Sequence, residues 1–140
     1  MDRLKSCVSE LHSFEPVELC NLQYDPSRGS SIDPHIDDVW LWGEQLVTIN
    51  LLSGTILTLI NKNCPNVEIQ IPMPARSLLV LFDEARYTWM HCIKADHISD
   101  IRMAMTFRNL SDEFSGGGPQ QEIGTKLIEV ATKFDGTVIR

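Results

Sequence analysis

The sequence predicts an all-β core, a jelly roll or double-stranded β-helix, followed by a C-terminal amphipathic helix. Eight short runs alternate apolar and polar residues with the period of two that is typical of half-buried strands. Turn-forming residues separate the runs, and 140 residues with 43% hydrophobic content suffice for one packed domain. Eight short strands with regular turns are typical of a double-sheet jelly roll.

The predicted strands follow one another from the first third of the chain to residue 110. They span residues 17–24, 35–37, 46–52, 55–61, 67–72, 77–82, 88–93 and 101–110. Turns are expected in segments that contain Gly, Pro, Asn, Asp or Ser, namely 25–31, 53–54, 61–66 and 83–84. We divide the chain into a short N-terminal segment, 1–16, and a core, 17–140.

A helix is predicted after the last strand, within residues 119–134. The run Gly116-Gly117-Gly118-Pro119 interrupts the chain first. Apolar residues then recur at helical spacing: Ile123, Leu127, Ile128, Ala131 and Phe134. An apolar stripe of this kind favours a helix packed on the barrel, and a partner-binding helix is the alternative.

Three residues predict a metal site. His35 and Asp37 share one face of a predicted strand, because side chains two apart point the same way, while Ile36 points away. His91, from a remote predicted strand, would complete a set of two imidazoles and one carboxylate. Such a set leaves coordination positions open and is typical of non-haem Fe(II) oxygenases. Ordinary surface or core histidines are the alternative, since an H-x-D triplet alone is common.

The last predicted strand carries two arginines that suit a carboxylate ligand. Even spacing puts Arg102, Ala104, Thr106 and Arg108 on one face. A guanidinium binds a planar carboxylate through two hydrogen bonds and keeps its charge. A dicarboxylate such as 2-oxoglutarate would fit, with one end on iron and the other on an arginine. Surface ion pairing of the two arginines is the alternative.

These motifs together resemble the AlkB family of Fe(II)/2-oxoglutarate dioxygenases. The resemblance rests on His35-x-Asp37, on His91, and on the R-x5-R spacing from Arg102 to Arg108. Residues 32–44, 48–53, 74–81 and 106–114 are similar to one branch of that family, the fourth AlkB homologue of animals. The likeness extends from about residue 17 to the C-terminus.

The resemblance implies the ligands and the reaction. Iron would be held by His35, Asp37 and His91, and 2-oxoglutarate by Tyr24, Arg102 and Arg108, with dioxygen as the second cosubstrate. The reaction implied is oxidative N-demethylation, which yields succinate, carbon dioxide and formaldehyde. The same residues are the expected catalytic set.

One motif departs from the family pattern. Family members often carry N-x-Y on the first barrel strand, whereas here Asn21 lies three residues before Tyr24. Residues three apart on a strand face opposite ways, so only Tyr24 is expected in the pocket unless a bulge intervenes.

The N-terminal segment keeps two classes of function open. AlkB-like enzymes place a further segment before the first barrel strand, where it helps to form a substrate lid, and here that segment is expected to be missing or reduced to residues 1–16. This expectation favours a module with weak substrate handling. An active dioxygenase is therefore weighed against a catalytically weak iron-binding or scaffold module. The complete ligand set favours the enzyme, because burying arginine charges in a pocket costs folding free energy unless a ligand pairs with them.

Charge bears on the substrate. The chain has 12 basic and 19 acidic residues, with a net charge of −7, whereas nucleic-acid binding draws much of its affinity from Lys and Arg on phosphates. The resemblance implies either methylated lysine in a protein, such as actin, or N6-methyladenine in DNA, and the acidic balance favours protein. Trp40 and Trp42, expected on one strand face, could enclose a methylated ammonium or stack on a base; core packing is the alternative.

The cellular setting is expected to be the cytoplasm and nucleus, with the chain a monomer and no membrane partner. Charged residues occupy the start, where a signal peptide needs an apolar region, and no apolar run is long enough to span a bilayer. The cysteines lack C-x-x-C spacing and are expected to be free thiols: Cys7, Cys20, Cys64 and Cys92. Cys92 is expected to be a small buried residue rather than a metal ligand, because neighbours on a strand point apart.

Overall fold

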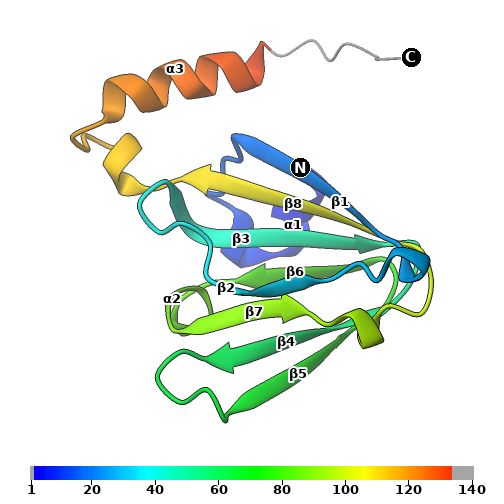
Figure 1. Cartoon of the computed structure of the whole chain (residues 1–140). Helices are drawn as coiled ribbons and strands as arrows, with labels where there is room; N and C mark the ends of the chain where they lie inside the picture. Colours follow the sequence, from blue (N-terminus) through cyan, green and yellow to red (C-terminus); the bar gives the residue numbers. More distant parts are fainter. Residues whose placement is uncertain (1, 134–140) are drawn as a thin grey trace.

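The computed structural model describes residues 2–133 and shows two antiparallel four-stranded sheets (Figure 1). One sheet has the order β1 (Glu18–Tyr24), β8 (Arg102–Leu110), β3 (Trp42–Leu51) and β6 (Ser77–Leu81). The other has the order β2 (Ile32–His35), β7 (Trp89–Ile93), β4 (Thr55–Asn61) and β5 (Glu68–Met73). Apart from the β4–β5 hairpin, each strand is followed by one in the opposite sheet. This winding is a jelly roll and confirms the predicted fold class.

Short helices join or flank the strands. They are α1 (Asp2–Cys7), η1 (Ser9–Leu11), η2 (Pro26–Arg28), α2 (Glu84–Tyr87), η3 (Ala95–His97), η4 (Asp112–Phe114) and α3 (Gln121–Thr132). None of the helices within residues 2–133 is long and apolar enough to cross a membrane. The cysteines whose side chains are described, Cys20, Cys64 and Cys92, are free thiols.

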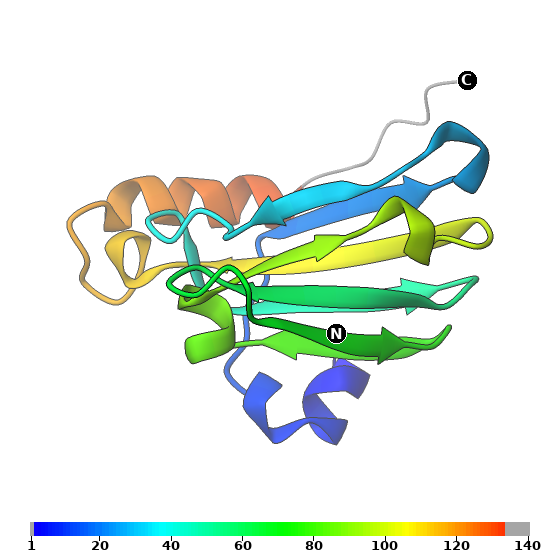
Figure 2. The same ribbon diagram turned by 60° about the horizontal axis from the view of Figure 1, so that its bottom comes forward.

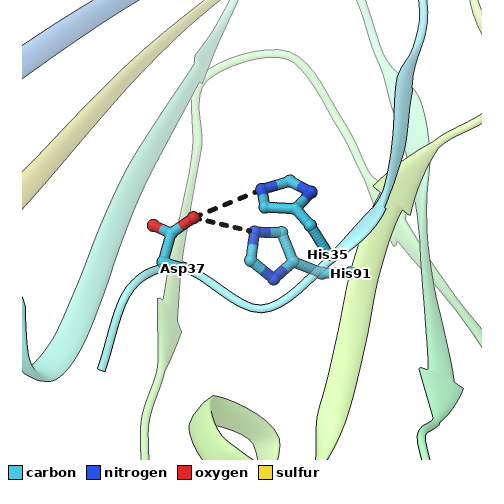
Figure 3. Close-up of side chains that lie close together, drawn as sticks. All are labelled: His35, Asp37 and His91. Carbon is cyan, nitrogen blue, oxygen red and sulfur yellow. Dashed lines mark ion pairs between the residues drawn. The ribbon is translucent and has the colours of Figure 1, made fainter. Parts of the chain in front are cut away.

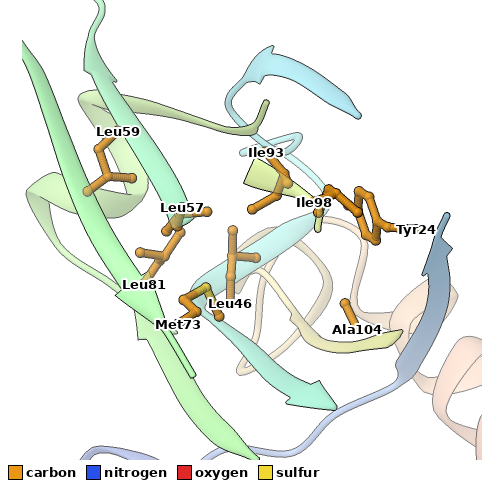
Figure 4. Packing of buried hydrophobic residues seen from close by; sticks show 9 residues of the cluster. All are labelled: Tyr24, Leu46, Leu57, Leu59, Met73, Leu81, Ile93, Ile98 and Ala104. Atoms are coloured by element: carbon orange, nitrogen blue, oxygen red, sulfur yellow. The ribbon is translucent and has the colours of Figure 1, made fainter. Parts of the chain in front are cut away.

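The main core fills the space between the sheets. It contains Tyr24, Leu46, Leu57, Leu59, Met73, Leu81, Ile93, Ile98 and Ala104 (Figure 4). On β3, β4 and β7 the residues next to them in the chain, such as Val47, Thr58 and Cys92, are buried as well, so both faces of these strands are covered. Each large apolar side chain buried here contributes roughly 1.5–3 kcal/mol.

The N-terminal segment packs on the outside of the barrel. Leu11 and Phe14, both fully buried, contact Val47 of β3 in a second apolar cluster. Figure 2 shows the N-terminal helices beside the sheets, on the side away from α3. The segment therefore covers part of the outer face of the sheet that contains β3.

The predicted strands lie within a few residues of the observed ones, but two predictions near the site are wrong. β2 ends at His35, so Asp37 lies in the loop that follows and not on a strand. Trp40 lies in a turn while Trp42 begins β3, so the two tryptophans do not share a strand face. The cause is local: the carboxylate of Asp38 accepts hydrogen bonds from the backbone N–H groups of Trp40 and Leu41, both at 2.8 Å. Such side-chain-to-backbone bonds favour a turn over a strand.

The C-terminal helix forms where the sequence predicts it, but the apolar residues of its stripe are not buried against the barrel. Phe134 of the predicted stripe lies outside the described residues. Four of the apolar residues are 41–68% exposed: Ile123, Leu127, Ile128 and Val130. Gly124 alone is buried, against the backbone and side chain of Phe114. Gly116 and Gly117, at φ values of 57° and 95°, turn the chain beyond the sheet before the helix begins.

Candidate metal centre and cosubstrate pocket

His35 and His91 face each other across two neighbouring strands. They are paired in the register of β2 and β7, and their ring centroids are 4.3 Å apart. Residues directly opposite each other on antiparallel strands project to the same side of the sheet. Both imidazoles therefore point into the space between the sheets (Figure 3).

Asp37 joins the two histidines from the loop after β2. Its Oδ1 lies 3.2 Å from Nε2 of His35 and 3.9 Å from Nε2 of His91. The potential ligand atoms of the three residues all lie within 4.8 Å of one another. Among residues 2–133, no other group of His, Cys, Asp or Glu side chains converges in this way. The predicted triad is thus assembled, although its carboxylate comes from a loop.

The protonation states of the triad suit a metal ligand set. Burial opposes ionisation of Asp37, but hydrogen bonds with His35 and Arg108 outweigh it and hold the pKa of Asp37 well below its usual range. Burial, assisted by repulsion from His35, lowers the pKa of His91 to about 4. Near neutral pH, Asp37 is therefore an anion and His91 a neutral imidazole, which are the forms that bind metals.

His35 is oriented by its own strand. Its Nδ1 donates a hydrogen bond to the carbonyl of Asp33 at 2.7 Å, which leaves Nε2 facing Asp37 and His91. An outer hydrogen bond of this kind fixes the tautomer and the ring plane of a metal-binding histidine. One carboxylate oxygen and two imidazole nitrogens form a donor set that fits Fe(II) and leaves further coordination positions open.

Arg108 holds the carboxylate of Asp37 from the opposite sheet. Its Nε donates to Oδ2 of Asp37 at 2.7 Å, and its Nη1 donates to Glu18 at 2.5 Å. The Arg108 guanidinium also lies 5.7 Å from the ring centre of Trp42. Because Oδ2 is bound by Arg108, Oδ1 is left to face the histidines. Arg108 is expected to hold a cosubstrate carboxylate, and the structure shows that it also orients the carboxylate of Asp37.

Arg102 is a buried cation with an unused donor. The residue is 2% exposed, its Nε donates to Oδ1 of Asn50 at 2.5 Å, and its guanidinium lies 4.7 Å from the ring centre of Tyr24. Its Nη1 is buried and makes no hydrogen bond within the described chain. An unpaired buried guanidinium nitrogen is costly unless a ligand accepts from it. A carboxylate is the acceptor that matches this geometry.

Asn50 is a site residue that the sequence reasoning missed. It is fully buried in β3, and its Nδ2 donates to the backbone carbonyls of Ser53, Met73 and Pro74 at 2.8–3.1 Å. These bonds fix its Oδ1 toward Arg102. The sequence feature that indicates its role is a lone amide inside the apolar run T-I-N-L-L, because a buried polar side chain needs hydrogen-bond partners.

One cavity connects the metal triad with Arg102. Its lining includes the triad, Tyr24 and both arginines, with apolar walls from the two sheets. Arg102 and Arg108 are six residues apart on the same face of β8, roughly 20 Å along the strand. The short side chains of Ala104 and Thr106 lie between them and leave room. The triad and Arg102 therefore line the same cavity.

Other candidate residues lie where the sequence places them. The β1–β8 register is continuous from Glu18 to Tyr24, so no bulge turns Asn21 inward, and Asn21 is exposed on an outer groove. His97 lies in η3 and is not part of the metal cluster. Cys92 is buried, and burial raises the pKa of its thiol. It is thus a buried thiol outside the ligand cluster, as expected.

Comparison with known proteins gives several relatives, although no protein-family model matches the chain. It is 45% identical to the human protein named alpha-ketoglutarate-dependent dioxygenase alkB homolog 4, over 90% of this chain and 51% of that protein. It is 41% identical to a Caenorhabditis elegans protein named DNA N6-methyl adenine demethylase, over 88% of this chain and 42% of that protein. The chain thus spans about half the length of these curated relatives.

A solved structure shares the fold. It is the crystal structure of a prolyl-4-hydroxylase from Pseudomonas putida, with a TM-score of 0.54 and 16% sequence identity. The match covers 79% of this chain and 61% of that one. At this identity the likeness supports the jelly-roll fold alone.

The triad generates a prediction about metal binding. His35→Ala, Asp37→Ala and His91→Ala should each weaken Fe(II) binding. The loss should exceed the roughly 10–100-fold reduction that follows removal of a residue hydrogen-bonded to a metal ligand. His12→Ala and His97→Ala should bind normally, because neither side chain is in the cluster. Anaerobic Fe(II) titration of the five variants measures this. An essential His97 with a dispensable His91 would show that the ligand assignment is wrong.

A second prediction separates the cosubstrate from the metal. Arg102→Ala should leave Fe(II) affinity nearly unchanged but cost about 2–5 kcal/mol of 2-oxoglutarate binding, because a buried charge pair loses one partner. Arg102→Lys should recover only part of this, since an ammonium cannot form two parallel hydrogen bonds to a carboxylate. Titration calorimetry with 2-oxoglutarate tests both variants. Equal cosubstrate affinity in wild type and Arg102→Ala would exclude the assignment.

The third prediction concerns pH. The hydrogen bond with Asp37 raises the pKa of His35, whereas the pKa values of Asp37 and His91 are lowered. As pH falls toward mildly acidic values, His35 is therefore the first ligand at which protons compete with metal. We expect metal affinity to fall as pH drops through the raised pKa of His35, by about tenfold per unit below it. Titrations between about pH 8 and about pH 5 measure this, and a flat profile would contradict it.

Proposed function

Because this chain belongs to the AlkB family of alpha-ketoglutarate-dependent dioxygenases, we propose that it is an Fe(II)- and 2-oxoglutarate-dependent oxidative N-demethylase. The observation that carries the proposal is the unpartnered, buried Nη1 of Arg102, in the same cavity as the His35, Asp37 and His91 triad. A weak iron-binding scaffold would have no use for this unpaired cation, whose burial is costly.

Different residues of the chain would bind the metal and the cosubstrate. Bound iron, with 2-oxoglutarate as co-reductant, would supply the oxidation of an N-methyl group by dioxygen, with succinate, carbon dioxide and formaldehyde as products. His35, Asp37 and His91 would hold the metal from one side. Arg102 would hold the far carboxylate of 2-oxoglutarate, and the buried phenol of Tyr24, whose pKa burial raises, stays protonated and can donate to it. The apolar walls of the cavity would exclude water from the reaction.

We propose methylated lysine in a protein as the substrate, with actin as the candidate that the sequence resemblance implies. A cleft of about 420 Å³ lies beside the loop that carries Asp37. Among the described residues, none that lines the cleft is basic. The aromatic and acidic side chains of its lining are Trp40, Trp42, Tyr87, Glu44, Asp112 and Glu113. A methylated ammonium is attracted both to aromatic faces and to carboxylates.

The position and charge of the cleft support this choice. Trp42 lines the cleft, and its ring centre lies 5.7 Å from the guanidinium of Arg108, which binds the proposed metal ligand Asp37. The cleft thus adjoins the proposed reaction centre. Its carboxylates would repel phosphates, and the whole chain has a net charge of −7.

Methylated adenine in DNA is the second candidate. The Caenorhabditis elegans relative is named DNA N6-methyl adenine demethylase. Trp40 is 58% exposed and makes a T-shaped contact with Phe114, and an exposed aromatic ring can stack on a base. The two candidates differ in charge, so salt dependence separates them.

The substrate proposal predicts a specific pattern of turnover. Formaldehyde and succinate should form from a monomethyl-lysine peptide, with KM nearly independent of salt between about 50 and 200 mM. Trp40→Ala and Asp112→Asn should each raise the peptide KM about fivefold. The first removes a cation–aromatic contact and the second an ion pair with the ammonium, each of which contributes about 1 kcal/mol. Glu122→Gln, on the exposed face of α3, is the matched control and should change nothing. Turnover of methylated DNA alone, with KM rising steeply with salt, would reverse the choice of substrate.

A further inference from the structure

Arg86 is a buried arginine in α2 that belongs to neither the metal triad nor the cosubstrate pocket. It is 1% exposed. Its guanidinium donates hydrogen bonds to four backbone carbonyls: Nε to Gly43 at 3.2 Å, Nη1 to Asp37 at 3.0 Å, and Nη2 to Asp38 at 3.1 Å and Trp42 at 3.3 Å. A guanidinium presents five N–H donors in a fixed plane, so these carbonyls are held in one geometry.

The four carbonyls come from the two ends of one loop. Asp37 and Asp38 begin the loop after β2, and Trp42 and Gly43 end it at the start of β3. Arg86 therefore closes the loop at its base. In this closed form, the Asp37 carboxylate and the Trp42 ring both reach Arg108.

The position of Arg86 in the chain links this loop to the other half of the triad. α2 leads directly into β7, which carries His91 five residues after Arg86. Asp37 has no strand register to place it, unlike His35 and His91, which are paired across β2 and β7. Arg86 contacts the main chain of Asp37 and so links it to the segment that leads into β7.

We propose that Arg86 is a positioning residue for the metal centre, which fixes the backbone of Asp37 so that its carboxylate meets His35 and His91. The inference rests on the proposed function, because it assumes that the triad binds a metal. Arg108 orients the carboxylate of Asp37, while Arg86 holds its main chain. The hydrogen bonds of Arg86 go to main-chain oxygens and not to the triad side chains, and Arg86 does not line the cosubstrate cavity.

The test uses Co(II), a visible substitute for Fe(II), in binding titrations of the whole chain followed by absorption spectroscopy. Arg86→Met should raise the Co(II) Kd about tenfold and alter the absorption bands, which report ligand geometry. Arg86→Lys keeps the charge but cannot reach all four carbonyls, so its Kd should lie between those of Arg86→Met and wild type. Arg28→Met, at an exposed arginine, should match wild type.

A loss of stability alone must be distinguished from positioning. Leu11→Ala removes a fully buried side chain from the N-terminal cluster, so it should lower Tm while leaving the Co(II) Kd and spectrum unchanged. Wild-type Kd and spectrum in Arg86→Lys and Arg86→Met would overturn the inference and leave the metal site intact. If Arg86→Met does not fold, Arg86→Lys decides. Failure of the wild type to bind Co(II) or Fe(II) would instead overturn the proposed function, and the inference with it.

Discussion

The pairing of His35 with His91 across β2 and β7 is the constraint on which the rest of the site depends. Side chains alternate along a strand, so a shift of one residue in this register would turn an imidazole away from the space between the sheets. Asp37 can complete the triad only where both rings already converge. The jelly-roll winding therefore does more than bury apolar residues, because it sets two distant segments side by side at one point.

Three arginines serve this site in different electrostatic settings. Arg86 is paired with backbone carbonyls, Arg108 with two carboxylates, and Arg102 with the amide oxygen of Asn50 while one nitrogen stays unpaired. Inside a protein, an unpaired polar group costs more than it does in water, because the surroundings cannot compensate it. The unpaired nitrogen of Arg102 is therefore the feature of the site that most directly calls for an anionic ligand.

Much of this arrangement follows from the sequence, because it depends on strand periodicity. The shared face of Arg102 and Arg108 and the outward direction of Asn21 are both consequences of a period of two. The loop after His35 could not be predicted in the same way, since the Asp38 carboxylate bonds to nearby backbone groups and ends the strand. The roles of Asn50 and Arg86 depend on partners far along the chain, which a local pattern does not reveal. The apolar stripe of α3 predicts a helix, but its periodicity does not indicate which surface covers the stripe.

We propose that the triad and Arg102 bind the two ends of one dicarboxylate. The most direct test of this claim is calorimetric titration of 2-oxoglutarate into the wild-type chain, with and without Mn(II), a metal that binds similar ligands without supporting turnover. We predict that one 2-oxoglutarate binds per chain and that removing the metal weakens binding strongly, because one of its two anchors is then lost. Equal affinity with and without metal, or no saturable binding, would contradict the claim.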